Sequence, residues 1–470
     1  MLNTKKLRLD SLAALGAQGL ALLCSMIMTL IIPKILGVES FGYWQLFIFY
    51  SSYVSYFQIG LVDGVYLRNG GKYRDEIDGA FINAQFRFFL AYQVAFSLII
   101  IVITLCTVSD ANRSYVLMAE SAYLVISNAC YFWGYFLQAI NETRKFSYSL
   151  AFDRLAFLAP LLLCAAMKID DFRVYVALFL CARFISLIYV LYNVKELLST
   201  VPKKMSSVLK GSLLEMKNGL ILSTANICSM LILGCARFVI DWRWGIEEFG
   251  QLSLSLSMVN FAITFITQIS MVLFPAVRQL EKKDAKFFFF KVRLLSLGLL
   301  PVGYLLYYPL RAFVVAWLPQ YSSAAQYLLF LIPICVLEAQ TNLVYITYYK
   351  VFNRQLELLL INLLALAIGA AGSFVGAFVF ENIELTVALS LVGIMARYIV
   401  SDFVVAKDLK LGNRASLAAS ISLAVLFIII GSSFSTLLSC AITVVVLVIY
   451  YAIYMSQADV RSFLESGGNQ

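Results

Sequence analysis

The sequence contains no histidine and little charge. Only 13% of its 470 residues are Asp, Glu, Lys or Arg, whereas soluble domains carry about a quarter. Without His there are no His-ligated metal sites, His general bases or His pH switches. The nine cysteines form no Cys-x-x-Cys pair and lie within or beside apolar segments. We therefore expect them to be small core residues, and we expect no metal site and no cofactor.

Hydrophobic residues are abundant instead. They make up 61% of the chain, and the mean hydropathy is +0.85. Several apolar runs reach about 20 residues, the length that spans a bilayer. The sequence therefore predicts an all-α polytopic membrane protein. The basic segment 1–10 has no small-residue cleavage site at the usual distance behind it, so we expect the first helix to be a retained anchor.

Fourteen segments are long and apolar enough to be transmembrane helices. The predicted spans are 11–32, 41–63, 83–106, 115–140, 148–167, 173–193, 218–240, 250–275, 288–309, 323–349, 356–380, 383–405, 415–432 and 434–455.

The basic residues predict the orientation of these helices. Segments on one side of the membrane carry 25 of the 36 Lys and Arg, those on the other side carry six, and five lie within spans. Because cytoplasmic segments are enriched in Lys and Arg, this bias predicts that both termini are cytoplasmic. The segments between spans are too short for a folded catalytic domain, which argues against an enzyme.

The chain also contains an internal repeat. "CSMIMTLIIPKILGVESFGYWQL" from Cys24 is similar to "CSMLILGCARFVIDWRWGIEEFGQLSL" from Cys228. Arg183 in "CARFISL" corresponds to Arg397 in "MARYIVS", and the offset grows from 204 (228 − 24) to 214 (397 − 183). The repeat predicts two parallel six-helix lobes, at 1–195 and 217–410, joined by a basic cytoplasmic linker at 196–216. Two further helices and a short tail occupy 411–470. Parallel repeats are typical of transporters in which one half moves against the other.

Arginines within the predicted spans need a reason, because each costs roughly 2.5–3.5 kcal/mol at a helix centre. Those inside or near the spans are Arg87, Arg154, Arg183, Arg237 and Arg397. Arg87 and Arg154 lie near inner helix ends and could simply extend to the headgroups. Arg183 and Arg397 could tie helices together through hydrogen bonds. The alternative is a cation-lined cavity for an anionic substrate, since guanidinium groups suit phosphate oxygens.

Acidic residues near the spans are candidates for gating or ion coupling. Glu338 lies in the middle of a predicted helix and could carry a proton or bind Na⁺. Asp63 and Arg68 lie at the cytoplasmic end of the second helix, within "QIGLVDGVYLRNGGKYRDEIDG". They could form a gate or capping pair, or Arg68 could contact a phosphate group entering from the cytoplasm.

This last stretch carries a family resemblance. "LGVESFGYWQL" followed by "GLVDGVYLRNGGKYRDEID" resembles the Wzx-type oligosaccharide flippases of the MOP superfamily, which also contains the MATE exporters and lipid II flippases. The segment Gly-Leu-x-Asp-Gly with a following Arg is here Gly60, Leu61, Asp63, Gly64 and Arg68. The chain departs from the family at Asn69, where an aromatic residue is common.

The resemblance implies a function at a bacterial inner membrane. The protein would move undecaprenyl-diphosphate-linked oligosaccharide repeat units, such as O-antigen or exopolysaccharide units, from the cytoplasmic to the outer leaflet by alternating access. Its partners would be that lipid-linked sugar, membrane lipid and polysaccharide assembly proteins, with no nucleic acid. The alternatives are a MATE-like exporter coupled to H⁺ or Na⁺, in which acids would dominate the cavity, and a membrane polysaccharide polymerase or transferase, which would need a longer outer loop.

Overall fold

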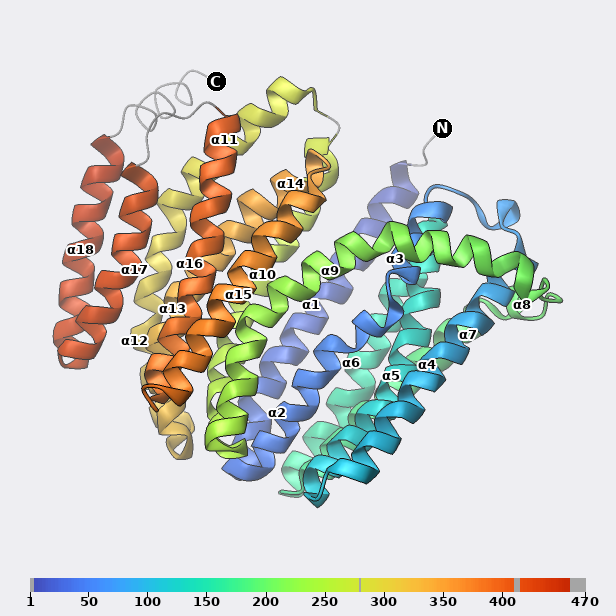
Figure 1. Ribbon diagram of the computed structural model, residues 1–470, viewed down its shortest axis with the longest axis horizontal. Coiled ribbons are helices and arrows are strands. Elements are labelled where there is room, and N and C mark those ends of the chain that lie inside the picture. The colour runs from blue at the N-terminus through green and yellow to red at the C-terminus, as the bar shows by residue number, and fades with distance from the viewer. Residues whose placement is uncertain (1–3, 279, 410–414, 457–470) are drawn as a thin grey trace. The chain divides into compact units, whose positions relative to one another are not determined.

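The protein is helical throughout the residues that the computed structural model describes, which are 4–278, 280–409 and 415–456. Within them there is no strand (Figure 1). Ten helices are long and apolar enough to cross a membrane, and the shorter apolar helices Gly19–Ile35 and Leu417–Ser433 add to them. The predicted all-α membrane fold is confirmed.

The chain forms two compact units, residues 1–227 and 228–470, with similar parts. The first unit contains α1 (Thr4–Ile35), α2 (Val38–Tyr53), η1 (Val54–Gln58), α3 (Leu61–Asn69), η2 (Arg74–Glu76), α4 (Gly79–Thr107), α5 (Ala111–Ala139), α6 (Thr143–Ala166), α7 (Phe172–Asn193), α8 (Lys195–Leu198) and the first half of α9 (Met205–Trp244). Its core is rich in aromatic rings, and Trp133 packs against Phe86, Phe132 and Phe136 where α4 meets α5.

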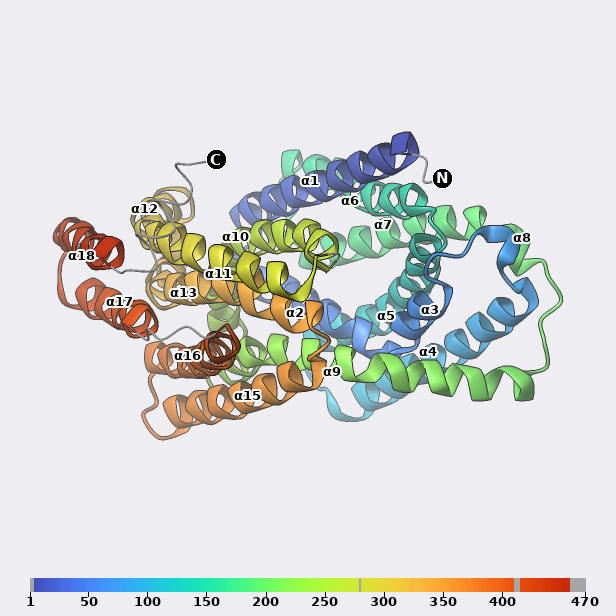
Figure 2. The same ribbon diagram turned by 90° about the horizontal axis from the view of Figure 1, so that it is seen from above.

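The second unit begins within α9. It continues through α10 (Ile246–Arg278), α11 (Lys282–Leu299), η3 (Leu300–Leu306), α12 (Tyr307–Trp317), η4 (Pro319–Tyr321), α13 (Ser322–Gln340), the π-helix η5 (Thr341–Ile346), α14 (Thr347–Val351), α15 (Gln355–Phe378), α16 (Ile383–Asp408), α17 (Ala415–Ser433) and α18 (Thr436–Ser456). Figure 2 shows α15 beside α16, and α17 beside α18.

Each of the fourteen predicted spans corresponds to a helix or a run of short helices, but three are interrupted. The span 41–63 breaks at Ile59 and Gly60, which have φ of 49° and 74°. The span 288–309 passes through a 3₁₀ segment at Pro301, which has no N–H to donate. The span 323–349 contains the π-helix, a feature frequent at functional sites. Apolar periodicity does not reveal such interruptions, because apolar residues continue across each of them.

The boundary between the two compact units lies at 227/228, within α9 and after the predicted linker 196–216. It forms α8, a short extended stretch and the start of α9, which continues as one helix to Trp244. Residues 217–227 therefore pack with the first unit, because α9 is 40 residues long and its first half bonds to α3 and α4.

Helices pair in the same way in both units. In the first unit α5 packs against α2 and α7, and α6 packs against α7. In the second, α13 packs against α10 and α16, and α15 packs against α16. These pairs correspond through the sequence repeat.

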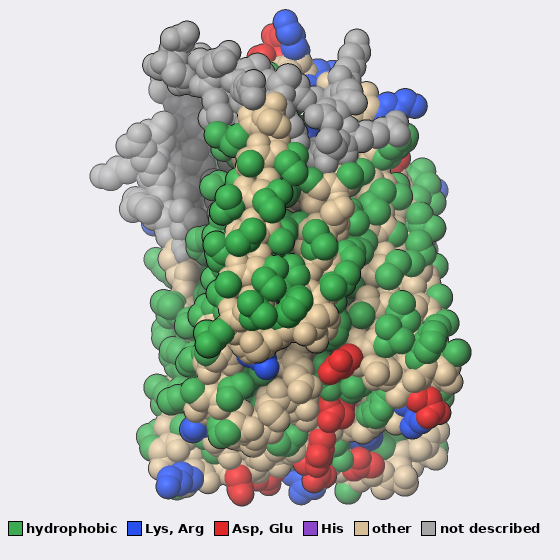
Figure 3. Space-filling model, turned by 90° about the vertical axis from the view of Figure 1, so that its left-hand side faces the viewer, with side chains coloured by type: hydrophobic (Ala, Val, Ile, Leu, Met, Phe, Trp, Pro, Cys, Tyr) green, Lys and Arg blue, Asp and Glu red, His purple; other side chains and the backbone are tan. Residues whose placement is uncertain are grey.

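The hairpin α17–α18 lies at the end of the second unit. Tyr450, Tyr451 and Tyr454 of α18 donate hydrogen bonds to the carbonyls of Leu297, Gly298 and Leu294, at 2.9, 2.8 and 2.7 Å. These carbonyls lie where α11 gives way to the 3₁₀ segment and helical hydrogen bonding changes. The face in Figure 3 is largely hydrophobic through its middle, with charged side chains at its upper and lower edges, as expected for a lipid-facing surface.

Candidate functional site

The stretch from Gly60 to Gly64 brings α3 into close contact with the first half of α9. A Cβ on Gly60 would lie 2.6 Å from the Leu220 nitrogen, and one on Gly64 would lie 2.4 Å from the Glu215 carbonyl oxygen. A Cβ on Gly219 would lie 2.1 Å from the carbonyl oxygen of Gly60. Both helices therefore need glycine at the crossing, and Gly60 also adopts a left-handed conformation.

Asp63 and Arg68 both bond to α9. The Ser223 hydroxyl donates to Asp63 at 2.7 Å. Arg68 Nη1 donates to Glu215 Oε1 at 2.7 Å, and Gln85 of α4 donates to the other oxygen of Glu215 at 2.6 Å. Asp63 and Arg68 therefore connect α3 to α9, and Gln85 connects α4 to the same part of α9. Sequence reasoning missed Glu215, because this residue lies in the predicted linker 196–216.

Arg68 remains half open to solvent despite this ion pair. Its side chain is 42% exposed, and the guanidinium lies 4.0 Å from the centre of the Phe81 ring. Beside it, Asn69, Lys72 and Asp78 line a polar cavity of about 70 Å³, well below the roughly 300–1,000 Å³ of ligand sites. Lys203 donates a hydrogen bond to Asp78 and holds the pKa of that carboxyl below its usual range.

Arg183 lies in the interior of the first unit. It is 2% exposed, and its Nε donates to the Ser127 hydroxyl of α5 at 3.2 Å. Nη1 lies 3.5 Å from Asp153 Oδ2 of α6, and the guanidinium lies 4.4 Å from the centre of the Tyr131 ring. Nη2 has no hydrogen-bond partner in the described structure. Arg183 thus connects α7 to α5 and α6 and retains one unused donor nitrogen.

Arg397, its repeat counterpart, lies in the interior of the second unit. It is 1% exposed, forms an ion pair with Glu338 of α13 and donates to the Ser229 hydroxyl of α9. Glu338 is 9% exposed and lies one turn before Asn342 of the π-helix, which donates to its carbonyl oxygen at 2.8 Å. The candidate ion-coupling residue Glu338 and the candidate anion-binding residue Arg397 are therefore paired.

The other candidate arginines are Arg237, Arg87 and Arg154. Arg237 is half-buried, donates to the Ser253 hydroxyl at 2.8 and 3.1 Å, and lies 4.9 Å from the centre of the Phe249 ring. Arg87 is exposed and donates to Asn83 at 3.3 Å. Arg154 is half-buried beside Asp153 on α6. The structure thus distributes the six candidate arginines over both units.

Sequence reasoning missed a buried ion pair in the second unit. Arg293 of α11 and Asp402 of α16, 4% and 3% exposed, form two hydrogen bonds of 2.7 and 3.2 Å. The Tyr345 hydroxyl of the π-helix adds a third bond to Asp402 at 2.6 Å. The orientation count placed Arg293 among the cytoplasmic basic residues, although it lies near the start of the predicted span 288–309. α11 begins earlier, at Lys282, so Arg293 lies well inside the helix. The aromatic run "FFFF" before it was the available signal that the helix starts earlier.

No group of three or more Cys, Asp or Glu that could hold a metal ion lies within the described ranges. The candidate residues include three ion pairs between helices, Arg68–Glu215, Arg183–Asp153 and Arg397–Glu338.

Comparison with solved structures identifies proteins of similar fold, whereas comparison with sequences does not. No protein-family model and no curated protein sequence matches the chain. Among solved structures, the chain is similar to the lipid II flippase MurJ in an inward closed conformation, with a TM-score of 0.62, 12% identity, and coverage of 95% of this chain and 98% of that one.

Two further solved structures share the arrangement. One is an inward-facing multidrug resistance MATE family transporter of the MOP superfamily, with a TM-score of 0.57, 10% identity, and coverage of 84% of this chain and 94% of that one. The other is a MOP superfamily transporter from Pyrococcus furiosus, with a TM-score of 0.50, 10% identity, and coverage of 86% and 95%. The chain is a multi-pass membrane protein with the fold of the MOP superfamily transporters.

Proposed function

We propose that the protein is a flippase that moves an oligosaccharide linked to undecaprenyl diphosphate from the cytoplasmic to the outer leaflet of a bacterial inner membrane. It would serve the assembly of a surface polysaccharide such as O-antigen or exopolysaccharide, as the Wzx-type proteins that it resembles do. The two units would alternate access to the substrate, and no covalent bond would be made or broken.

The extent of the similarity to the lipid II flippase supports this choice over a drug exporter. That match leaves 5% of 470 residues, about 24, outside the aligned region, so it must include part of segment 411–470. The MATE match leaves 16%, about 75 residues, which is enough to omit the whole of α17 and α18. At least part of the segment that carries α17 and α18 thus has a counterpart in a protein named for flipping a lipid.

Arginine is the residue type best suited to the diphosphate. A planar guanidinium can bind two phosphate oxygens at once. Arg68, which is 42% exposed beside Lys72 at the end of α3, is the proposed first contact. Arg87, Arg154, Arg183, Arg237 and Arg397 are proposed to contribute along the path, with Asp63 and Glu338 as gating or ion-coupling groups.

The Arg68–Glu215 pair allows a test that separates substrate binding from helix packing. Arg68→Ala removes both the ion pair and the proposed phosphate ligand. Glu215→Gln removes the ion pair but keeps Arg68 and an oxygen that can accept from Gln85. Each variant would be introduced into a strain lacking the flippase. Surface polysaccharide, lipid-linked oligosaccharide inside the cell and membrane protein level would then be measured.

We expect Arg68→Ala to lose surface polysaccharide at normal protein level while lipid-linked oligosaccharide accumulates inside. Glu215→Gln should retain display. Equal loss in both variants would instead mean that Arg68 acts by fastening α9. Full display in both would remove Arg68 from the substrate path. Arg183→Ala and Arg237→Ala in the same strain would test the interior arginines.

A coupled exporter of small cations is the second candidate, and the buried carboxylates favour it. Glu120 is 4% exposed, and only one of its carboxylate oxygens has a partner in the described structure, the Ser51 hydroxyl at 3.0 Å. In reconstituted vesicles, export of a cationic dye driven by an H⁺ or Na⁺ gradient, and abolished by Glu120→Gln or Glu338→Gln, would favour this function over lipid flipping.

A further inference from the structure

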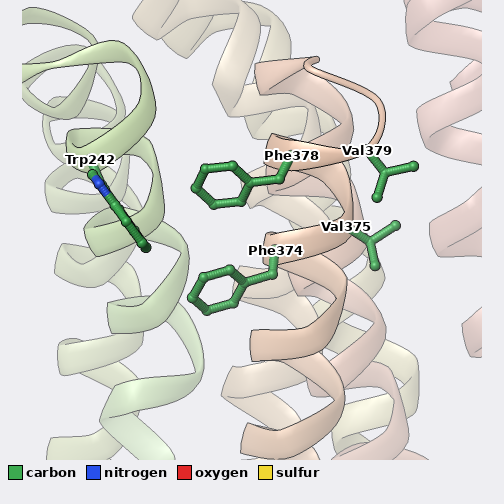
Figure 4. A pocket seen from close by; sticks show the side chains of 5 residues that line it. All are labelled: Trp242, Phe374, Val375, Phe378 and Val379. Atoms are coloured by element: carbon green, nitrogen blue, oxygen red, sulfur yellow. The ribbon is translucent and has the colours of Figure 1, made fainter.

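An apolar groove lies on the second unit, at the C-terminal ends of α9 and α15. It is lined by Trp242, Phe374, Val375, Phe378 and Val379 and has a volume of about 410 Å³. In Figure 4 the rings of Phe374 and Phe378 point from α15 toward Trp242 on α9. The ring centres of Trp242 and Phe378 are 5.3 Å apart, and those of Trp242 and Phe374 are 6.3 Å apart.

The aromatic side chains that line the groove are exposed, although all five lining residues are apolar. Trp242 is 64% exposed and Phe378 44% exposed, so the rings contact one another but cover little of their outer faces. Its volume falls within the roughly 300–1,000 Å³ of small-molecule sites. In a membrane, such a surface takes up a hydrocarbon chain.

Depth in the membrane places the mouth of the groove near the headgroups. α15 has 24 residues, about 36 Å at 1.5 Å per residue, whereas the hydrocarbon core is about 30 Å thick. Its last turn therefore lies near the boundary between hydrocarbon and headgroups. Trp is enriched at that depth, and two of the five Trp of this chain, Trp242 and Trp244, end α9.

Charged side chains follow the groove residues in sequence and indicate which lipid headgroup would fit there. Arg243 and Glu381 form an ion pair of 3.1 Å, with side chains 37% and 66% exposed. Arg243 follows Trp242 directly, and Glu381 lies two residues after Val379. Segment 241–249 holds three acids and Arg243, and segment 379–386 holds two acids and no base. Five acids against one arginine disfavour an anionic headgroup but suit one that carries an ammonium beside its phosphate.

We propose that this groove binds one acyl chain of a zwitterionic phospholipid with a primary ammonium headgroup. Arg243 contacts the phosphate and Glu381 accepts hydrogen bonds from the ammonium. The site is a lipid-binding site on the outer surface of the second unit. It is independent of the proposed transport, because none of its residues is a candidate for substrate contact.

The first test uses the unmodified protein. The purified full chain in detergent is titrated with dioleoyl phosphatidylethanolamine and, separately, with dioleoyl phosphatidylglycerol, and bound lipid is counted by native mass spectrometry. We expect one saturable phosphatidylethanolamine, retained at several-fold lower lipid concentration than phosphatidylglycerol. Equal retention of the two lipids, or tighter binding of phosphatidylglycerol, would overturn the assignment. So would tighter binding of a polyprenyl diphosphate, since the occupant would then be an anionic lipid.

The second test uses a matched pair of double variants. Phe374→Ala with Phe378→Ala removes two rings four residues apart, and we expect about fivefold weaker retention of the first lipid because apolar contact area is lost. Phe184→Ala with Ile188→Ala removes a similarly spaced pair on α7, 50% and 52% exposed, and should leave retention unchanged. Unchanged retention in the groove variant, or equal loss in both, would contradict a specific site.

Single changes at the mouth test the headgroup. Glu381→Gln should abolish the preference for phosphatidylethanolamine over phosphatidylglycerol, because the amide removes the charge that selects the ammonium. Arg243→Gln should weaken both lipids. Both residues are on the surface, and a monodisperse gel-filtration profile with an unchanged melting temperature would show that folding is intact. A retained preference in Glu381→Gln would overturn the role of this carboxylate.

Discussion

The two units differ in where their closest arginine–carboxylate ion pairs lie. In the first unit Arg183 meets Asp153 at 3.5 Å, whereas its tighter ion pairs lie at one end of the bundle, as in Arg68–Glu215 and Arg74–Glu142, both at 2.7 Å. In the second unit Arg293 and Asp402 form a two-fold hydrogen-bonded pair deep in the core. The repeat offset of 214 places Ile188 at the position of Asp402, and Ile188 is 52% exposed.

A sequence repeat thus specifies helix pairing without specifying the chemistry inside each unit. The same arginine position joins α7 to α5 and α6 in one unit, and α16 to α13 and α9 in the other. Because an arginine in a helix core needs an acceptor, each unit supplies one from whichever helix faces it. Among the described residues, the second unit thus buries the pairs Arg293–Asp402 and Arg397–Glu338, whereas the first unit buries Arg183–Asp153.

Breaking the Arg293–Asp402 pair should produce the largest effect. Asp402→Ala leaves a buried guanidinium without its main partner and removes the acceptor of Tyr345, so we expect a loss of about 3–5 kcal/mol in unfolding free energy. Thermal unfolding of the purified protein in detergent, with membrane protein level, measures it. Asp153→Ala in the first unit should cost clearly less.

The double change Arg293→Met with Asp402→Leu is the control for that comparison. Because it removes both charges together, it should recover much of the stability lost in Asp402→Ala. A double variant as unstable as the single one, or equal losses from Asp402→Ala and Asp153→Ala, would contradict the difference between the units.

Glycine packing in the first unit should give the next largest effect. Gly219→Ala places a Cβ 2.1 Å from the Gly60 oxygen, so α9 must shift, at a cost of about 1–3 kcal/mol. Gly37→Ala is the matched control, because nothing lies within 4 Å of its Cβ and its φ is −62°. The melting temperatures of the two variants would be compared, and similar values would show that the α3–α9 crossing tolerates a methyl group.

Substitution of a tyrosine in α18 tests the hydrogen bonds that hold this helix against α11 in the second unit. Tyr454→Phe removes one hydrogen bond to the Leu294 carbonyl, and we expect a loss of about 1 kcal/mol. Tyr148→Phe, at a 49% exposed tyrosine of α6, should change little. Limited proteolysis would report whether α17–α18 detaches first, and equal cleavage in both variants would argue against this attachment.

The smallest effect is expected from the Lys203–Asp78 pair at the end of the first unit. Lys203 lowers the pKa of Asp78 in the folded state, so the pair stabilises the protein above the ordinary pKa of Asp and loses this effect as pH falls through the lowered value. Lys203→Gln should therefore melt slightly below the wild type at pH 7, and the difference should vanish at strongly acidic pH. A difference independent of pH would assign the effect to packing.

The sequence predicted most of the architecture but little of the site. Apolar runs located helices at the fourteen predicted positions, because each run is a local stretch of chain. Interruptions such as Ile59–Gly60 escaped, since apolar residues continue across them. Arg183 and Arg397 lie within predicted spans and are buried, whereas Arg293 was counted among the cytoplasmic basic residues and Glu215 lies in the predicted linker.

What the sequence alone determined is the class of the protein, its number of spans and its repeat, all of which follow from the length and composition of local segments. The tertiary structure decided which charges meet. Arg68 and Glu215 are 147 residues apart, and Arg293 and Asp402 are 109 apart, so no local pattern links them. A buried charge takes the nearest acceptor that helix packing provides, and packing is a property of the whole unit.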